Sequence, residues 1–202
     1  MARFYEHRSW QKSRSPILTE PHIGQNGRMN KSDAKLGASV KTPSLSTADF
    51  RSALGMFATG VTIVTARSAA GALVGLTANS FNSVSLDPPL VLWSLAQRAG
   101  SLPVFAQGTH YAIHILAAEQ RDLAERFAQR GVDRFAGLAF HAGAGGAPIL
   151  EGTAAVFECF NRSRYEEGDH VIFVGQVERC EHRSGAQPLI FHGGRYFTEL
   201  PL

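Results

Sequence analysis

The stretch that most constrains the fold of this chain runs from Gly75 to Leu95, with the sequence G-L-T-A-N-S-F-N-S-V-S-L-D-P-P-L-V-L-W-S-L. It begins with alternating apolar residues and ends in an apolar run, as two strands would. Small hydroxyl and amide residues fill the middle, and they favour irregular backbone whose N–H groups stay available. Pro88 and Pro89 exclude a helix, because proline lacks the amide donor. The pattern therefore predicts a strand, a polar turn, a strand, and a proline turn into a buried strand.

This pattern has two interpretations. A polar turn between strands can hold a flat polar ligand by its edge, through main-chain donors that the fold fixes in place. The same residue types are also common in ordinary turns. The stretch alone therefore leaves a ligand site and a plain loop open.

The net charge of +3 at pH 7 is distributed unevenly along the 202 residues. Residues 1–47 carry eight lysines and arginines against three acidic residues, a net charge of +5, which leaves −2 for the remainder. This balance gives no reason to expect nucleic acid as a partner of the folded part. The sequence has no apolar run long enough to cross a membrane and no secretory leader. We therefore expect a cytoplasmic protein without membrane contact.

The beginning of the chain differs from the rest in pattern. Residues 1–44 have mixed polarity and no apolar period, so we expect residues 1–46 to be a flexible N-terminal extension. Residues 47–202 are expected to form one folded domain. Cys159 and Cys180 are expected on opposite arms of one hairpin, out of register, as two reduced and buried thiols.

Short apolar segments bounded by turn residues predict about nine strands and three helices. Strands are expected within residues 79–95 and at residues 61–66, 73–78, 111–116, 138–141, 154–161, 171–181, 189–192 and 195–199. Helices are expected from a cap at Ser46 or Thr47 to Gly60, over residues 102–107, and over residues 119–130. Because strands mostly follow strands, the order predicts a mainly β, closed or nearly closed antiparallel barrel with helices outside.

Several common site motifs were tested and do not match. The glycines of residues 143–145 lack the third glycine and the helix that a dinucleotide fingerprint needs. The sequence has no phosphate-binding P-loop, no H-E-x-x-H and no C-x-x-C. His110 and His114 have no carboxylate or thiol near them in sequence, so we expect no metal site.

Five segments point to a family when they are taken together. They read F-R-S-A-L-G-M-F-A-T-G-V-T-I-V-T at residues 50–65, G-L-T-A-N-S-F-N-S-V-S-L-D-P-P-L-V at 75–91, L-A-E-R-F-A at 123–128, G-D-H-V-I-F-V-G at 168–175 and P-L-I-F-H-G-G-R-Y at 188–196. In order and spacing the chain resembles the flavin reductase-like family, over residues 47–200. The resemblance implies an antiparallel split β-barrel of Greek-key type with a few peripheral helices.

The resemblance also implies where a flavin would lie. Main-chain groups along the polar turn would meet the ring edge and the ribityl chain, at Thr77, Ala78, Asn79, Ser80 and Phe81, and again at Ser83, Val84 and Ser85. The phosphate would be held by Arg98 and by Ser101 at a helix start. Here the chain reads Q-R-A-G-S, with fewer hydroxyls than the family often has, so the contact depends more on Arg98 and main chain. From the sequence alone, Arg98 is equally consistent with a solvated loop arginine.

Three further residues are implied by the resemblance. His170, in the Gly-Asp-His segment, would line the nicotinamide side of the ring as a catalytic residue; the alternative is a turn histidine bonded to Asp169. Tyr196 would cover the ring from the partner subunit, or else be an ordinary core aromatic. Phe127, with Arg130, would contact flavin or only pack its helix.

The implied activity is hydride transfer from NADH or NADPH to FMN, with FAD as the other candidate flavin, to supply reduced flavin to a partner monooxygenase. The alternative is a non-catalytic flavin- or haem-binding split barrel. A barrel of this size is filled by side chains, so the flavin is expected on the outer wall, covered by a second subunit of a homodimer.

Overall fold

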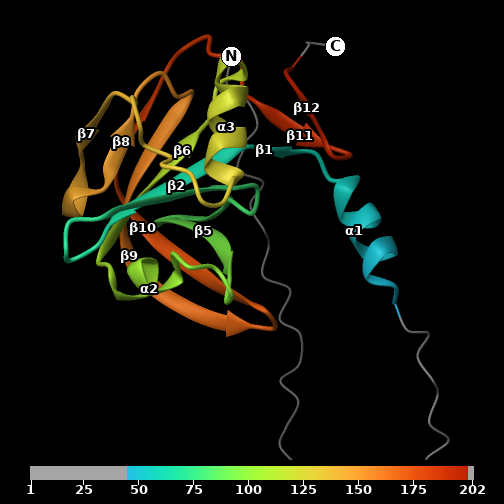
Figure 1. Ribbon diagram of the computed structural model, residues 1–202, viewed down its shortest axis with the longest axis horizontal. Helices are drawn as coiled ribbons and strands as arrows, with labels where there is room; N and C mark the ends of the chain where they lie inside the picture. Colours follow the sequence, from blue (N-terminus) through green and yellow to red (C-terminus); the bar gives the residue numbers. More distant parts are fainter. Residues whose placement is uncertain (1–44, 200–202) are drawn as a thin grey trace, which may run out of the picture. The chain divides into compact units, whose positions relative to one another are not determined.

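The computed structural model describes residues 45–199, and the predicted N-terminal extension lies outside them except for its last two residues. The main element is a seven-stranded antiparallel sheet (Figure 1). Its strands are, in spatial order, β3 (Leu73–Ala78), β2 (Thr62–Arg67), β6 (His110–Ile115), β9 (Ala155–Glu167), β10 (His170–His182), β5 (Pro89–Ala96) and β4 (Asn82–Leu86). The predicted mainly β, antiparallel architecture is confirmed. Strands β3 and β4 are the two edges, and only residues 79–81 separate them in sequence.

Two small sheets and three α-helices complete the fold. The first small sheet joins β1 (Thr59–Gly60), β11 (Ile190–His192) and β12 (Arg195–Phe197), and the second joins β7 (Phe140–Ala142) and β8 (Pro148–Leu150). The α-helices are α1 (Thr47–Gly55), α2 (Leu102–Gln107) and α3 (Arg121–Ala128), with short 3-10 turns at Ala118–Gln120 and Ala144–Gly146. Figure 1 shows α3 against the barrel and α1 standing away from it.

Aromatic side chains fill the interior of the barrel. Trp93 stacks on Phe173 with 4.8 Å between ring centroids, and Phe105 and Tyr111 meet Trp93 edge to face. All four side chains are buried. Gly175 permits this packing, because a Cβ there would come within 2.4 Å of the Tyr111 hydroxyl. The interior therefore has no room for a ligand the size of a flavin.

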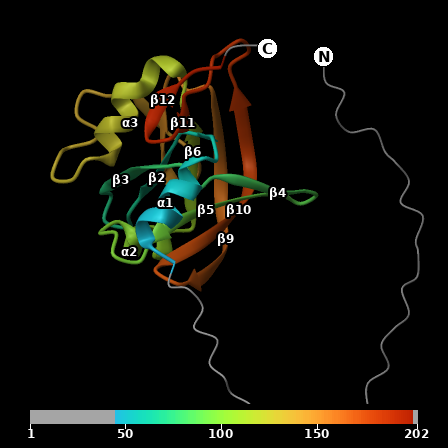
Figure 2. The same cartoon turned by 90° about the vertical axis from the view of Figure 1, so that its right-hand side faces the viewer.

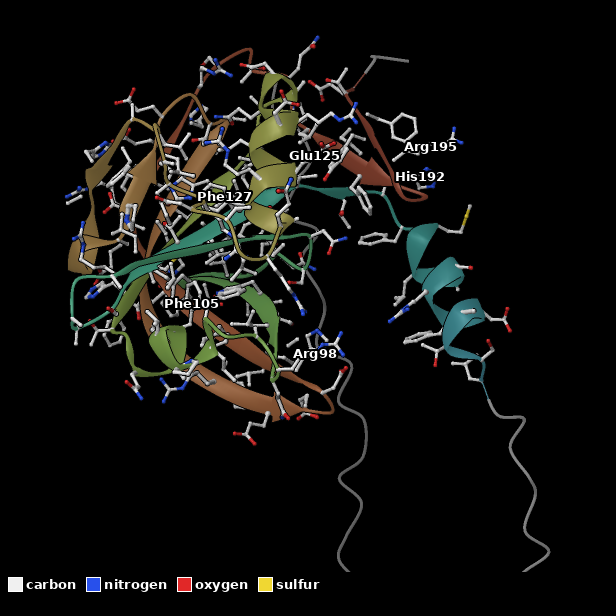
Figure 3. All side chains as sticks on the ribbon, in the orientation of Figure 1. Arg98, Phe105, Glu125, Phe127, His192 and Arg195 are labelled. Carbon is white, nitrogen blue, oxygen red and sulfur yellow. The ribbon has the colours of Figure 1, made fainter. Side chains whose placement is uncertain are left out.

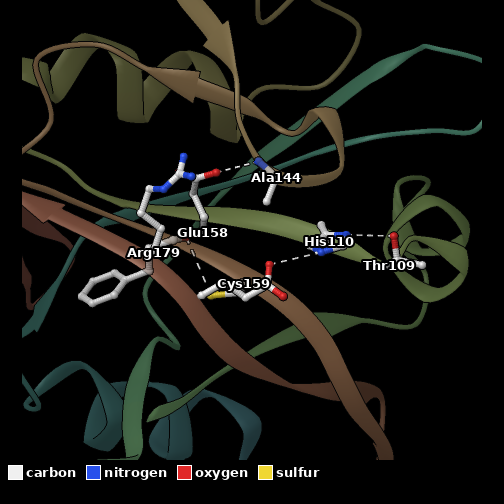
Figure 4. A network of polar contacts seen from close by, with 8 residues as sticks. Thr109, His110, Ala144, Glu158, Cys159 and Arg179 are labelled. Atoms are coloured by element: carbon white, nitrogen blue, oxygen red, sulfur yellow. Dashed lines mark hydrogen bonds and ion pairs between the residues drawn. The ribbon is translucent and has the colours of Figure 1, made fainter.

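A polar network outside this core fixes the loop between β7 and β8. The buried carboxylate of Glu158 accepts a hydrogen bond from the Ala144 amide at 2.6 Å and pairs with Arg179 at 3.2 Å (Figure 4). His110 lies within 3.3 Å of Glu178 and 2.9 Å of the Thr109 hydroxyl. Since a buried carboxylate is costly unless it is hydrogen-bonded, these contacts hold the loop and the long β9–β10 hairpin together.

Several sequence expectations need correction. Helix α1 begins after Ser46, one of the two predicted caps, but ends at Gly55, because Gly60 pairs with Ile190 in a strand. Helix α3 ends at Ala128 rather than at residue 130, and β8 falls in the segment expected as a loop apart from residues 138–141. Cys180 is exposed rather than buried.

Both cysteines are free thiols, as expected. Cys159 lies opposite Val177 and Cys180 opposite Phe157, so the two are out of register across the hairpin. Burial raises the pKa of the Cys159 thiol to about 12.

His114 connects three strands in the core. Its Nδ1 lies 3.0 Å from the Ile63 carbonyl oxygen, and its Nε2 accepts from the Leu150 amide at 3.1 Å. The carbonyl requires a proton on Nδ1 and the amide requires none on Nε2, so the ring is held neutral. Burial accordingly lowers the pKa of His114 to about 4.

We predict that His114 makes stability fall as the pH drops from 6.5 towards 4. The unfolded chain protonates this ring near pH 6.5, whereas the folded chain resists protonation until about pH 4. The full loss below that range is about 3 kcal/mol. An NMR titration should show His114 neutral down to about pH 5. A midpoint for His114 near 6.5 would contradict the prediction.

Candidate functional site

A cleft of about 750 Å³ lies beside the edge strand β3. One wall is the turn between β5 and α2, and the other is the end of α3 with the loop that follows it. Figure 3 labels Arg98 on the first wall and Phe127 on the second. The lining residues are Leu73–Thr77, Leu95, Arg98–Ser101, Phe127, Ala128 and Arg130–Phe135.

A second, smaller cavity of about 120 Å³ lies at the end of β3. It is lined by Val61, Thr77, Ala78, Asn79, Phe191 and Tyr196. Thr77 lines both cavities, so together they form a nearly continuous surface from the Arg98 turn to the β11–β12 hairpin. The structure thus brings together these predicted site residues: Thr77, Ala78, Asn79, Arg98, Ser101, Phe127 and Tyr196.

The hydroxyls of the polar turn are already committed within the fold. The Thr77 hydroxyl donates to the Ala124 carbonyl of α3 at 2.6 Å. The Ser80 hydroxyl accepts from the Ser94 amide at 2.9 Å and donates to the Ser94 carbonyl at 3.2 Å. Because these two hydroxyls fix the turn against α3 and β5, the turn can offer a ligand its main-chain groups and the Asn79 side chain.

The cationic side chains of the cleft differ in their partners. Arg98 and Arg130 are exposed, and neither makes a hydrogen bond or ion pair with another residue in the range 45–199. Arg134 instead bonds to two main-chain carbonyls. Ser101 occupies the N-cap position of α2, but its side chain makes no capping bond. The cleft therefore offers two arginines and a hydroxyl to an anion.

His170 lies outside both cavities. It begins β10, where it pairs with Ala96, and its Nδ1 is 2.7 Å from the Asp169 carboxylate. This contact lowers the pKa of Asp169. The Gln97 amide donates to the Asp169 carbonyl at 2.9 Å, which ties the His170 turn to the turn that carries Arg98.

Tyr196 packs within its own chain. Its ring lies 5.4 Å from that of Phe191, and the Arg121 guanidinium lies 5.6 Å from its centroid. Burial raises the pKa of its phenol. The sequence left two roles open for Tyr196, covering the ring from the partner subunit or ordinary core packing, and in this chain it packs on Phe191 and lines a cavity.

The remaining predicted residues lie apart from these cavities. Phe81 turns toward the core and packs on Phe157, with 5.5 Å between ring centroids. Ser83 and Val84 are exposed on β4, and Ser85 is half-buried on the same strand. The structure brings none of the following into either cavity: Ser80, Phe81, Ser83, Val84, Ser85 and His170.

The sequence analysis missed the wall formed by the loop after α3. Val132, Arg134 and Phe135 line the cleft, although this segment was expected only as a loop. Its signal is the run G-V-D-R-F at residues 131–135, an arginine and an aromatic inside a glycine-rich segment. Gly75 lets the wall approach β3, because a Cβ there would lie 2.6 Å from the Phe127 ring.

Between residues 45 and 199, no three His, Cys, Asp or Glu side chains are grouped closely enough to hold a metal ion. In the same range, no helix has the length and apolar character needed to cross a bilayer.

The fold and the cleft define a split antiparallel barrel with a cationic cleft at one edge of its sheet. The model of the flavin reductase like domain matches residues 54–199. The chain therefore belongs to the flavin reductase-like domain family.

Individual relatives agree with this assignment. The chain is 49% identical over 147 residues to the FMN reductase (NADH) SmoA of Agrobacterium fabrum, covering 73% of this chain and 83% of that one. It is 42% identical over 150 residues to the reductase component of the flavin-dependent trigonelline monooxygenase of Acinetobacter baylyi, covering 74% of this chain. The match spans only 48% of the length of that relative.

A solved structure gives the same result. The NADH:FAD oxidoreductase SgcE6 of Streptomyces globisporus, in complex with NAD and FAD fragments, superposes with a TM-score of 0.72 at 37% identity. The match covers 76% of this chain and 93% of that one.

Proposed function

We propose that this chain is an NADH-dependent flavin reductase, which transfers a hydride from the nicotinamide to FMN or FAD. The observation that carries the proposal is the cleft of about 750 Å³ with two exposed arginines, Arg98 and Arg130, on its facing walls. The chain that holds this cleft is 49% identical to an NADH-dependent FMN reductase.

The residues of the cleft fit a flavin nucleotide. The volume falls within the roughly 300–1,000 Å³ that cofactor sites occupy. The arginines and the Ser101 hydroxyl suit a phosphate, and the buried Phe127 ring with Leu76 provides apolar surface. Strand β3 is an edge, so part of its main chain has no strand partner and is available to the ring edge.

We assign roles to the residues on this basis. The main chain of residues 77–81 would hold the polar edge of the ring, and residues 83–85 on the other edge strand would contact the ring or ribityl chain. A bound flavin supplies the hydride acceptor, its N5 atom. The contribution of the protein is placement, which must bring the nicotinamide C4 to about 3–3.5 Å from N5. His170, held by Asp169, would contact the nicotinamide.

We further propose that the reduced flavin serves a separate monooxygenase, which the chain meets transiently. The support is the name of the Acinetobacter relative, a reductase component of a monooxygenase. The alternative is a split barrel that binds flavin or haem without catalysis. It differs in one measurable respect, because such a protein would not consume NADH when flavin is added.

Stopped-flow reduction of FMN by NADH tests the proposed activity directly. When the purified chain is mixed with FMN and NADH, the absorbance of oxidised flavin should fall. FAD in place of FMN and NADPH in place of NADH are compared in parallel. His170→Ala should raise the KM for NADH and leave the Kd of FMN unchanged, because it acts on the nicotinamide side. Bound flavin that keeps its colour with both nicotinamides would support the non-catalytic alternative.

We predict that Arg98→Ala weakens FMN binding by about 1.5–3 kcal/mol, the range for a hydrogen bond to a charged group. Riboflavin lacks the phosphate and should bind the variant and the parent almost equally. The loss should shrink at high salt, because an exposed phosphate contact is screened. Fluorescence titrations of both ligands measure this. An equal loss for FMN and riboflavin would show that Arg98 supports the turn instead.

We also propose a homodimer with the flavin at the subunit interface. Helix α1 has no buried residue. Phe50 and Leu54 on this helix are 50% and 57% exposed, and Phe57, two residues beyond its end, is 75% exposed. A helix of nine residues is marginal in water by itself, so its apolar face needs a cover. The edge strand β4 also exposes Val84 and Leu86, and Figure 2 shows it extending beyond the sheet. A second copy of the chain would cover both surfaces.

We predict that the chain is a dimer at micromolar concentration and that Leu54→Asp with Phe57→Asp shifts it to monomer. A charge on this face cannot be buried without a partner. Sedimentation equilibrium measures the shift, and flavin affinity should fall with it. A wild-type monomer that binds FMN fully would contradict the proposal.

A further inference from the structure

The Arg134 side chain connects the loop after α3 to strand β3. The Arg134 guanidinium donates from Nη1 to the Gly75 carbonyl of β3 at 3.0 Å and from Nε to the Gln129 carbonyl at 3.1 Å. Its Nη2 also donates to the Gln129 carbonyl. Both contacts reach main chain, one on the edge strand and the other where α3 ends. Arg134 therefore spans the base of the loop.

The two ends of this loop segment differ in how firmly they are packed. Phe135, next to Arg134, meets Phe127 at 5.2 Å and Phe140 at 5.8 Å between ring centroids. Residues 130–133, which precede it, are exposed and line the cleft. The exposed part has no aromatic packing of its own. Asp133 Oδ1 accepts a hydrogen bond from the Phe135 amide at 3.0 Å, and Arg134 joins the two ends of the segment.

The chemistry of these contacts distinguishes Arg134 from the other arginines of the cleft. Three of its N–H groups are already taken by carbonyls, whereas Arg98 and Arg130 have no such partners among the described residues. A planar guanidinium can reach two carbonyls with a fixed angle between its donors, which a lysine ammonium does not reproduce. Arg134 is thus suited to hold main chain in place rather than to bind an anion.

We propose that Arg134 is a positioning residue for the flavin, an inference that rests on the proposed function. By joining Gly75 to Gln129, it holds residues 130–133 as a fixed wall and places Arg130 across the cleft from Arg98. The wall then contributes to binding without the entropic cost of ordering a loop each time a flavin binds.

Arg126 provides a matched control. Its Nη1 donates to the Ala136 carbonyl of the same loop at 3.1 Å, and the side chain is exposed and does not line this cleft. Arg126→Gln therefore also removes an arginine and a bond to the loop main chain. It leaves the connection between Gly75 and Gln129 intact.

The test compares Arg134→Gln, Arg134→Lys and Arg126→Gln with the parent in three measurements. Trypsin cleavage after Arg130, a site that all variants keep, reports the loop without flavin. Fluorescence titration gives the Kd of FMN and of riboflavin. Thermal unfolding reports the stability of the whole domain.

Both Arg134 variants should be cleaved after Arg130 about tenfold faster and should bind FMN about tenfold more weakly, a free-energy change of about 1.4 kcal/mol. The affinity for riboflavin should fall less, because the displaced Arg130 would face the phosphate, which riboflavin lacks. Added FMN should slow cleavage of the parent. Arg126→Gln should change each quantity by less than about twofold, and the melting temperatures of Arg126→Gln and Arg134→Gln should be similar.

Two outcomes would overturn the inference. One is an Arg134→Gln variant that matches Arg126→Gln in FMN affinity. The other is a loss of FMN affinity without faster cleavage, which would make Arg134 a direct ligand. A parent that binds FMN but does not oxidise NADH would refute the proposed activity and leave this comparison decisive for Arg134. A parent that binds no FMN would refute both.

Discussion

The stacked aromatic rings inside the barrel are the constraint on which the rest of the structure depends. Trp93 and Phe173 lie 4.8 Å apart, and Phe105 and Tyr111 close the remaining space. This packing stabilises the sheet through apolar burial and leaves no internal chamber. A large planar ligand therefore has to use the outer wall. The outer surface offers a ligand the most hydrogen-bonding groups at the edges of the sheet, because edge strands carry main-chain groups that are not paired with another strand.

The two edge strands of the sheet differ in how they are covered. Strand β3 is covered by α3, with Thr77 bonded to the Ala124 carbonyl and Gly75 allowing the Phe127 ring to approach. Strand β4 remains exposed, with Val84 and Leu86 turned to the surface. The first arrangement builds a cleft within one chain, whereas the second provides a surface that a partner can cover. The polar turn that joins these edges is fixed by its own hydroxyls.

Sequence patterns predicted the elements that depend on local chemistry. Alternating apolar residues located the strands, Ser46 marked the start of α1, and the five family segments indicated the split barrel. Gly60 was mistaken for a helix end because a glycine also fits a short edge strand, and tertiary pairing decided between the two. The commitment of the Thr77 and Ser80 hydroxyls could not be predicted, because their partners are 47 and 14 residues away. The wall at residues 131–135 was missed for a related reason, since glycine-rich composition indicates only an irregular segment.

The three arginines of the cleft differ in their hydrogen-bond partners, and this difference suits one of them to fixing main chain and the other two to binding a phosphate. Arg134 donates three of its five N–H groups to two main-chain carbonyls, a contact suited to fixing main chain. Arg98 and Arg130 are exposed, and any phosphate they hold remains open to water and salt. A reductase that hands its flavin to another protein has to release it, so affinity should come from a few screened contacts on a preorganised surface rather than from enclosure. A rigid wall lowers the entropic cost of binding, while exposed cations keep dissociation fast. The roles proposed for these residues make rigidity and release compatible in this cleft, because different arginines would supply them.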